Sequence, residues 1–263
     1  MLKVNGFEIP RGSFPDGTLH MKFDSMYRTI GAYNEIEWFY EDDAELFALI
    51  CLKRHLDEVE PLKTCLYLPY IPHARMDRVK SIEDVFTLKY FCEVINSLNF
   101  FEVVVVDAHS NVSLALLNNV INIQPEAQLK KLADKLGNPL MFYPDEGAMK
   151  RYSELISAPY TFGMKDREWE TGKIRGLILM NKELVKDKDV LIVDDICSRG
   201  GTFYHSAKAL KEAGAKNIYL FVSHLEHTVF EGEMISSGLI DKIYTLKTIF
   251  CEDWANEKIE VIK

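Results

Sequence analysis

The sequence predicts an α/β fold in which mostly parallel sheets are flanked by helices, and two observations support this prediction. Short apolar runs bounded by polar or turn residues recur along the chain, as is typical of strands covered on both faces. Segments with apolar residues at helical spacing lie between these runs. Strands that alternate with helices favour parallel pairing, because parallel strands need a long crossover connection.

Five apolar runs are predicted to be buried strands: Cys65–Leu68, Val103–Val106, Leu140–Tyr143, Val190–Val193 and Ile218–Val222. Three segments are predicted to be helices: Ala44–Leu56, Asp84–Leu98 and Thr202–Ala213. The third is expected to begin at a capping threonine, Thr202, and to stop at Gly214.

Two of the strands end on acidic residues, in the segments VVVVDAHSN at Asp107 and VLIVDDICSRGG at Asp194. This weak internal similarity predicts two halves of similar topology with a boundary near Pro125. We therefore expect one domain over residues 1–125 and a second over residues 126–263.

Composition excludes several classes of protein. The chain has 263 residues and a net charge of −9, whereas proteins that bind duplex nucleic acid usually carry a basic surplus. The five scattered cysteines contain no CxxC pair, which favours a reducing compartment over a disulfide framework or structural zinc. The amino terminus has no apolar signal core, and no run reaches the roughly 18 apolar residues of a membrane span. These features predict a soluble cytoplasmic protein without nucleic-acid or membrane partners.

The segment from Asp189 to His224 carries the most specific chemistry. It predicts a strand, a loop, a helix and a second strand, with the loop at the carboxyl end of the first strand, where open parallel sheets bind ligands. Asp194 and Asp195 can accept hydrogen bonds from vicinal ribose hydroxyls. In the loop Ser198–Thr202, Gly200 and Gly201 let backbone N–H groups face an anion near a helix start. The alternative is a solvated turn with two surface acids.

This segment resembles the sugar-phosphate signature of the phosphoribosyltransferase superfamily, in which the acidic pair holds ribose and the loop holds the 5′-phosphate. The resemblance implies a sugar-phosphate site formed by Asp194, Asp195, Cys197, Ser198, Arg199, Gly200, Gly201 and Thr202. Diphosphokinases of this superfamily normally carry an acid and a threonine where this chain has Ser198 and Arg199. The difference makes the loop more positive by about two charges, so it is expected to accept more phosphate charge than one monoester carries.

Other segments resemble the ribose-phosphate diphosphokinase (phosphoribosyl pyrophosphate synthetase) family over almost the whole chain. The segment YLPYIPHARMDRVKS is similar to the family's ATP-binding segment, which assigns Arg75, Asp77 and Arg78 to ATP. The segment FPDGTLHMKF is similar to one that reaches a neighbouring subunit's adenine site, which assigns Phe14 and Asp16 to the nucleotide; Thr18 stands where the family has glutamate.

The resemblance also implies magnesium as cofactor and a mobile catalytic loop. His109, in VVVVDAHSN, and Asp145, in MFYPDEGAMKRYSEL, fall on the family's metal-associated residues, and His109 also belongs to its ATP site. The polar segment Gly163–Gly176 is expected to be a loop that closes over the triphosphate. Lys165 and Arg167 match two of three basic residues that open this loop in the family, and we assign them to catalysis.

The family resemblance predicts that two phosphoribosyltransferase-like domains transfer the diphosphoryl group of ATP to the anomeric hydroxyl of ribose 5-phosphate. The first domain would carry the ATP segment and the second the sugar-phosphate and catalytic loops. It further implies a homo-oligomer with shared ATP sites. The match stops near Ile262, before a helical segment of typical members, as in short phage-like forms, which would place the protein in the host cytoplasm.

Three alternatives remain open from the sequence. The same reaction on ADP-ribose would give ADP-ribose pyrophosphate for NAD rebuilding in a phage, and the replacement of the acid and threonine by Ser198 and Arg199 makes this acceptor plausible. A phosphoribosyltransferase would use the diphosphate sugar with a base and without ATP. A catalytically silent regulatory or assembly subunit would release no AMP.

Overall fold

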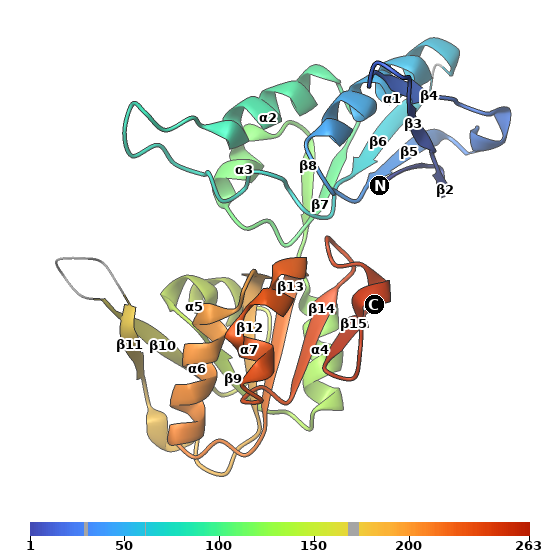
Figure 1. The fold of residues 1–263 in the computed structure, drawn as a ribbon. Coiled ribbons are helices and arrows are strands. Elements are labelled where there is room, and N and C mark those ends of the chain that lie inside the picture. The colour runs from blue at the N-terminus through green and yellow to red at the C-terminus, as the bar shows by residue number, and fades with distance from the viewer. Residues whose placement is uncertain (29–30, 61, 168–173) are drawn as a thin grey trace. The chain divides into compact units, whose positions relative to one another are not determined.

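The computed structural model describes residues 1–28, 31–60, 62–167 and 174–263. The chain divides into two compact units, Met1–Gln124 and Pro125–Lys263 (Figure 1). Each unit is built around one sheet with its own buried hydrophobic core.

The amino-terminal unit contains a six-stranded sheet in the order β2-β1-β5-β6-β7-β8. β5 to β8 pair in parallel, whereas β1 pairs antiparallel with both β2 and β5. The strands are β1 Leu2–Val4, β2 Phe7–Glu8, β5 Tyr33–Trp38, β6 Lys63–Tyr67, β7 Val103–Val106 and β8 Val120–Ile123. A separate hairpin is formed by β3 Arg11–Ser13 and β4 Leu19–Met21, and the helices are α1 Ala44–Val59, α2 Thr87–Ser97 and α3 Asn111–Leu116, with a 3₁₀ turn at Ser25–Tyr27.

The second helix of this unit begins three residues later than predicted. α2 starts at Thr87 and not at Asp84. The carboxylate of Asp84 accepts hydrogen bonds from the backbone N–H groups of Lys80 (2.8 Å) and Ser81 (3.0 Å). Such local side-chain bonds stabilise a turn in place of a helical start.

The carboxy-terminal unit contains a seven-stranded sheet in the order β11-β10-β9-β12-β13-β14-β15. All neighbouring pairs are parallel except β10 and β11. The strands are β9 Leu140–Tyr143, β10 Tyr160–Arg167, β11 Ile174–Leu179, β12 Val190–Cys197, β13 Ile218–Leu225, β14 Lys242–Leu246 and β15 Ile259–Ile262. The helices are α4 Glu126–Lys135, α5 Glu146–Tyr152, α6 Gly201–Glu212 and α7 Glu233–Ser236, with 3₁₀ turns η2 Lys182–Leu184, η3 His227–Glu231 and η4 Glu252–Trp254.

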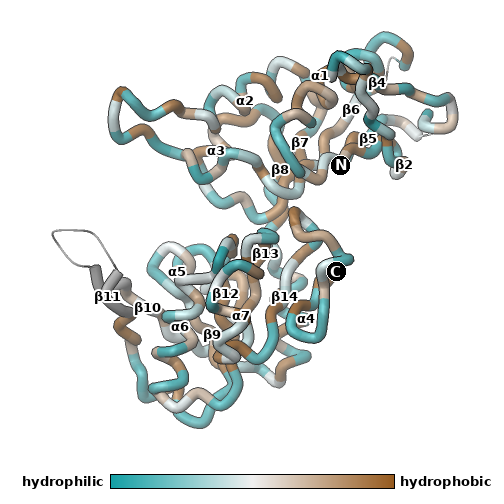
Figure 2. The backbone as a smooth tube through the Cα atoms, viewed as in Figure 1, coloured by the Kyte–Doolittle hydropathy of each residue, from teal (hydrophilic) through white to brown (hydrophobic). Residues whose placement is uncertain are grey.

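The central strands of this second sheet are its most buried part. All four residues of Val190–Val193 are fully buried, as their continuous apolar run predicts. Figure 2 shows hydrophobic residues along these inner strands and hydrophilic residues along the connecting loops. A parallel sheet buried in this way presents the carboxyl ends of its strands as a site for ligands.

One further expectation for this unit needs correction. The segment Gly163–Gly176 is not simply a loop, because its two flanks pair as antiparallel strands, with Gly163 opposite Leu179 and Asp166 opposite Gly176. Residues 168–173 lie outside the described part of the chain. In the described residues no helix combines the length and the apolar character that a membrane span requires.

Candidate active site

The two aspartates of the predicted ribose site lie within β12, which continues beyond them to Cys197. Asp194 is half-buried in this part of the strand. Asp195 is buried, and its carboxylate forms an ion pair with the guanidinium of Arg151 from α5. The backbone N–H of Asp195 donates to the carboxylate of Asp194 at 3.0 Å. Arg151 therefore fixes one carboxylate of the pair.

The predicted phosphate loop ends at the start of α6. Gly200 is the N-cap residue and adopts a left-handed conformation (φ 76°), which glycine reaches without strain. Thr202 was predicted to cap this helix, and that prediction is wrong, because Thr202 lies inside the first turn, where its carbonyl accepts a hydrogen bond from Ser206 Oγ at 2.8 Å. Since a glycine has no side chain with which to cap, the first N–H groups of α6 and the positive end of its dipole favour an anion.

Both residues that depart from the family pattern contact carboxylates that follow β13. Ser198 Oγ donates to Glu226, whose carboxylate also accepts from Thr228 Oγ1 at 3.2 Å. The guanidinium of Arg199 contacts Glu231 at 2.9 Å and 3.2 Å. The carboxylate of Glu231, in η3, thus partly neutralises the extra positive charge expected in the loop.

Gly232 fixes the distance between η3 and the phosphate loop. A Cβ atom at this position would lie 1.9 Å from the carbonyl oxygen of Arg199, so only glycine fits. This constraint, like the contacts of Glu226 and Glu231, is absent from the local motif. The sequence carries only a weak signal for these contacts. Acidic residues follow β13, and the carboxyl end of β13 lies beside that of β12 because the two strands pair in parallel.

Asp145 lies at the carboxyl edge of the same sheet, directly after β9, which pairs with β12. It is the N-cap of α5, and its carboxylate accepts from the backbone N–H of Ala148 at 3.0 Å. A Cβ at Gly147 would come within 3.2 Å of this carboxylate. The structure thus places Asp145 just beyond the carboxyl end of the strand that neighbours β12.

The two predicted catalytic residues lie on β10. Lys165 pairs with Leu177 of β11, and Arg167 pairs with Ile174 after an irregularity in the ladder. Their side chains lie outside the described part of the structure, as does the connecting segment 168–173. The position of the two residues in the sheet is therefore given by the backbone, in which β10 pairs in parallel with β9.

In the amino-terminal unit, Phe14 and Asp16 lie in the turn between β3 and β4. Phe14 is 52 % exposed, and its ring contacts His20 edge-on at 4.9 Å. The carboxylate of Asp16 accepts hydrogen bonds from Thr18 Oγ1 (2.7 Å) and from the Thr18 backbone N–H (3.0 Å). These bonds, led by that from the Thr18 side chain, lower the pKa of Asp16. Thr18, which replaces the family's glutamate, thus stabilises this turn.

The predicted ATP segment forms a loop after β6. Arg75 and Arg78 are exposed, and Arg78 Nε lies 3.4 Å from the carboxylate of Asp77. His73, in a left-handed conformation (φ 62°), contacts Asp43 at 3.1 Å through Nε2. Two exposed guanidinium groups on one loop form a surface that suits phosphate.

His109 follows β7 in a short connection to α3. Asp107, which precedes it, is fully buried and adopts a left-handed conformation (φ 43°) that is uncommon outside glycine. Ser110 caps α3 by accepting a hydrogen bond from the backbone N–H of Val112 at 3.1 Å. Unusual backbone conformations of this kind concentrate at functional sites.

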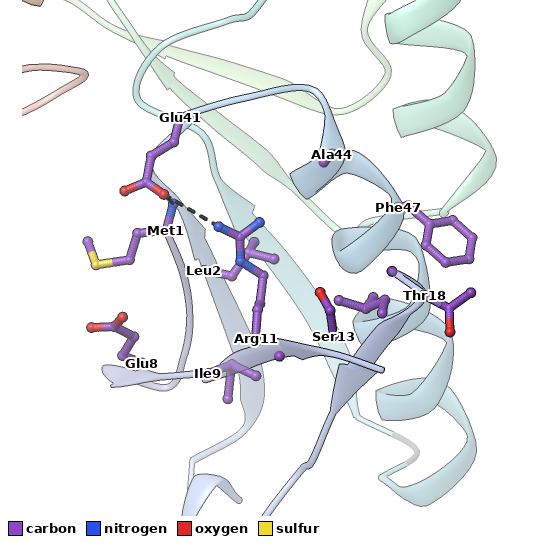
Figure 3. Close-up of a pocket in the computed structure, with 13 residues that line it drawn as sticks. Met1, Leu2, Glu8, Ile9, Arg11, Ser13, Thr18, Glu41, Ala44 and Phe47 are labelled. Atoms are coloured by element: carbon purple, nitrogen blue, oxygen red, sulfur yellow. Dashed lines mark hydrogen bonds and ion pairs between the residues drawn. The ribbon is translucent and has the colours of Figure 1, made fainter. Parts of the chain in front are cut away.

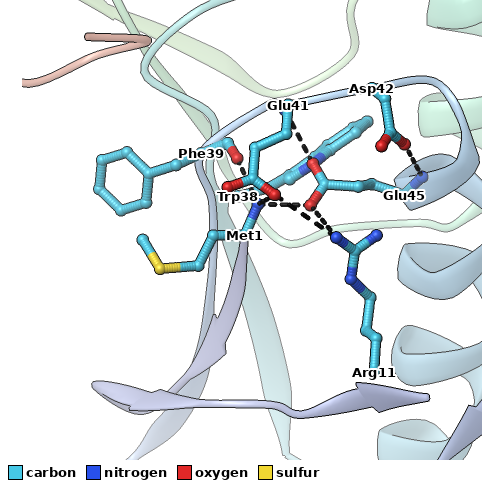
Figure 4. Close-up of polar contacts among 7 residues, drawn as sticks. All are labelled: Met1, Arg11, Trp38, Phe39, Glu41, Asp42 and Glu45. Carbon is cyan, nitrogen blue, oxygen red and sulfur yellow. Dashed lines mark hydrogen bonds and ion pairs between the residues drawn. The ribbon is translucent and has the colours of Figure 1, made fainter. Parts of the chain in front are cut away.

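A pocket of about 700 Å³ lies beside the β3–β4 hairpin, between Arg11, Thr18 and Phe47 (Figure 3). Next to it, Arg11 contacts the buried carboxylate of Glu45 at 2.9 Å, and Trp38 Nε1 donates to the same carboxylate at 2.8 Å (Figure 4). Burial raises the pKa of Glu45, but the hydrogen bonds of the Met1 amino group, Trp38 and the Glu41 backbone lower it overall. This network anchors the hairpin base to α1.

The described residues contain no group of three or more His, Cys, Asp or Glu side chains that could hold a metal ion. Magnesium, however, commonly takes one or two protein carboxylates and completes its shell with water and substrate phosphates. The carboxylate of Asp145 at the ligand-binding edge fits this pattern. His109 fits it less well, since hard cations prefer oxygen ligands.

Comparison with known proteins identifies the fold. A model of the phosphoribosyl transferase domain matches residues 130–252. The structure superimposes on the crystal structure of phosphoribosylpyrophosphate synthetase from Mycobacterium smegmatis with a TM-score of 0.78, covering 97 % of this chain and 85 % of that one at 18 % identity. The fold class is therefore α/β with two phosphoribosyltransferase-like domains, as predicted.

The sequence relatives define the family. Ribose-phosphate pyrophosphokinase of Pyrococcus abyssi is 31 % identical over 216 residues, which cover 80 % of this chain and 74 % of that protein. The enzyme of the same name from Saccharolobus solfataricus is 28 % identical over 230 residues, covering 86 % and 79 %. The chain belongs to the ribose-phosphate pyrophosphokinase family, which confirms the resemblance on which the site assignments depend.

Proposed function

We propose that the protein is an ATP-dependent diphosphotransferase that converts ribose 5-phosphate and ATP into phosphoribosyl pyrophosphate and AMP. The observation that supports it most directly is the glycine-capped start of α6 beside the aspartates of β12, in a member of this family. That arrangement offers carboxylates to ribose hydroxyls and uncapped N–H groups to a 5′-phosphate.

In this reaction the anomeric oxygen of the sugar attacks the β-phosphorus of ATP. The bond between the β-phosphorus and the oxygen bridging to the α-phosphorus breaks, AMP leaves with that oxygen, and the hydroxyl proton passes to solvent. Such transfer depends on alignment and on charge neutralisation more than on covalent chemistry. Asp194 and Asp195 orient the ribose, and residues 198–202 hold its phosphate.

The nucleotide is assigned to groups of the amino-terminal unit. Arg75 and Arg78 bind its phosphates, Asp77 orients Arg78 through their 3.4 Å contact, and His109 lies in the connection between β7 and α3. The exposed Phe14 stacks on the base and Asp16 accepts a hydrogen bond at the nucleotide of a neighbouring subunit, so the active form is a homo-oligomer with shared ATP sites. In this division the amino-terminal unit contributes the ATP segment and the carboxy-terminal unit the sugar-phosphate and catalytic segments.

Lys165 and Arg167 stabilise the negative charge that develops on the transferring group. Asp145 and the substrate phosphates would hold magnesium, which would supply further charge neutralisation, and His109 is assigned to the metal-associated residues of the amino-terminal unit. The chain's own contribution to the chemical step is therefore positional and electrostatic.

An assay of AMP release with ATP, magnesium and ribose 5-phosphate tests the proposal. Lys165→Ala and Arg167→Ala are expected to lower kcat by about 10²-fold to 10³-fold with little change in ATP affinity, because their contacts form mainly in the transition state. Lys131→Ala, an exposed residue of α4, is the matched control and should behave as wild type. Absence of AMP release from the wild-type protein would contradict the proposal, and equal losses in kcat and ATP affinity would assign the two residues to ground-state binding.

ADP-ribose is a second candidate acceptor, favoured by one specific observation. Arg199 replaces a residue of the family loop and is 72 % exposed, and its guanidinium contacts the exposed carboxylate of Glu231. A cation in this position can serve a second phosphate of the acceptor. Replacing ribose 5-phosphate by ADP-ribose in the same assay distinguishes the two acceptors.

A further inference from the structure

The predicted ATP segment contains a histidine, His73, to which the proposed function assigns no role. His73 Nε2 lies 3.1 Å from Asp43 Oδ1, and the same oxygen accepts a hydrogen bond from the Tyr40 hydroxyl at 3.0 Å. For Nε2 to donate to a carboxylate, the imidazole must carry a proton there, as the Nε2 tautomer or as imidazolium. Side chains from two segments distant in the chain thus meet at one carboxylate oxygen.

The carboxylate of Asp43 serves this contact and not its own helix. Asp43 is the N-cap residue of α1, a position at which aspartate commonly accepts a hydrogen bond from the first turn. Here its side chain forms no such bond. Burial, together with the hydrogen bond to Asp43, raises the pKa of the Tyr40 hydroxyl, so Tyr40 stays a donor at neutral pH. The carboxylate is therefore held in the orientation that meets His73.

His73 also closes the turn that carries Arg75. Its carbonyl accepts a hydrogen bond from the backbone N–H of Met76 at 2.8 Å, so Arg75 occupies the third position of a four-residue turn. The left-handed backbone of His73 (φ 62°) is uncommon outside glycine and persists where the surrounding structure holds it. The imidazole ring also contacts Phe91 of α2, with ring centroids 5.5 Å apart.

Burial distinguishes the anchored part of this segment from its arginine. Ile71 and Ala74, on either side of His73, are buried in the hydrophobic core with exposed fractions of 3 % and 2 %. Arg75, the next residue, is exposed. The guanidinium is thus presented by a backbone that core packing and the contacts of His73 hold in place. A binding group held in this way needs less ordering when its ligand arrives.

We propose that His73 is a positioning residue for the nucleotide, whose contact with Asp43 holds the turn that presents Arg75 to the phosphates of ATP. This proposal rests on the proposed function, because it concerns the same ATP segment. The two side chains are 24 % and 67 % exposed, so their contact contributes little to global stability and its effect is expected in nucleotide binding. Binding of the acceptor, which is assigned to the other unit, should not depend on it.

The test measures the KM for ATP and for ribose 5-phosphate in His73→Asn. Asparagine tolerates the left-handed backbone, but its side chain is too short to replace the imidazole. The KM for ATP should rise about fivefold to tenfold, the scale of a charged hydrogen bond weakened by solvent, and the KM for ribose 5-phosphate should not change. Asp43→Ala should give the same rise, and the double variant no further rise, because both substitutions remove one contact. His73→Gln should restore part of the affinity, since its amide can donate to Asp43.

His55→Asn is the matched control, because His55 is an exposed histidine of α1 whose ring contacts Phe23 at 5.5 Å. An unchanged KM for ATP in His73→Asn would overturn the proposal, as would equal rises for both substrates or additive losses in the double variant. If the wild-type protein releases no AMP, the proposed function fails, and calorimetric titration with ATP and magnesium, without acceptor, then decides the role of His73. Equal affinity of wild type and His73→Asn, or no binding by either, would overturn it.

Discussion

β7 and β12 each lie between two parallel strands in the sheet of their unit, yet the segments that follow them differ. β7 stops at Val106, and Asp107 then adopts a left-handed conformation inside the protein. β12 continues through both of its aspartates to Cys197. Each strand leads to a helix, but α3 has six residues and α6 has twelve.

The decisive difference between them is the cap of the following helix. Ser110 satisfies the start of α3 with its own hydroxyl, whereas Gly200 offers no side chain to α6. When a side chain of the protein accepts a hydrogen bond from the first N–H groups of a helix, fewer of these groups are left to bind an anion. A helix without a side-chain cap keeps these N–H groups available for a phosphate. Two strand ends with similar sequences thus differ in chemistry through one residue at the helix cap.

The largest effect is expected for Gly232→Ala, which disrupts the packing of Gly232 against the phosphate loop that follows β12. The new Cβ would lie 1.9 Å from the carbonyl oxygen of Arg199, so the loop must move. Displacement of a positioning loop by about 1 Å can cost about 10²-fold in rate, and we expect kcat/KM for ribose 5-phosphate to fall on this scale while ATP affinity is retained. Gly12→Ala is the control, since its Cβ would meet only ordinary contacts at 3.7 Å. Unchanged kinetics in Gly232→Ala would show that the loop needs no such support.

An intermediate effect is expected for Arg151→Gln, which removes the guanidinium paired with the buried Asp195. Charged hydrogen bonds of this kind contribute about 1.5–3 kcal/mol, so kcat/KM for ribose 5-phosphate should fall by about tenfold or more. Lys150→Gln is the neighbouring control, because Lys150 is exposed and pairs with Glu146 at 2.8 Å on the helix surface. If the two variants have similar kinetics, Arg151 does not contribute to the acceptor site.

The smallest effect is expected for Ser110→Ala, which removes the cap that distinguishes the β7 end. Loss of a serine N-cap costs about 1 kcal/mol, so the free energy of unfolding in urea should fall by this amount. The KM for ribose 5-phosphate should not change, because the acceptor is assigned to the other unit. An increase in that KM would mean that the two strand ends are not functionally separate.

Local sequence patterns predicted the strands better than the helix starts. The run Val190–Val193 is fully buried as expected, because burial of a continuous apolar segment between two covered faces removes its side chains from water. The start of α2 was wrong because Asp84 forms a local turn, and the start of α6 was wrong because Gly200 and not Thr202 precedes the helix. Helix boundaries depend on single hydrogen bonds, which periodicity does not specify.

The amino-acid sequence by itself determined the fold class and the family, through patterns that recur along the chain, and the sugar-phosphate motif, whose residues lie close together in the chain. Only the tertiary structure decided which groups surround that motif. Arg151 reaches Asp195 across 44 positions, Glu226 reaches Ser198 across 28 and Glu231 reaches Arg199 across 32. These contacts follow from the pairing of β9, β12 and β13 in one sheet, and a pairing of strands distant in the chain is a property of packing that no local pattern contains.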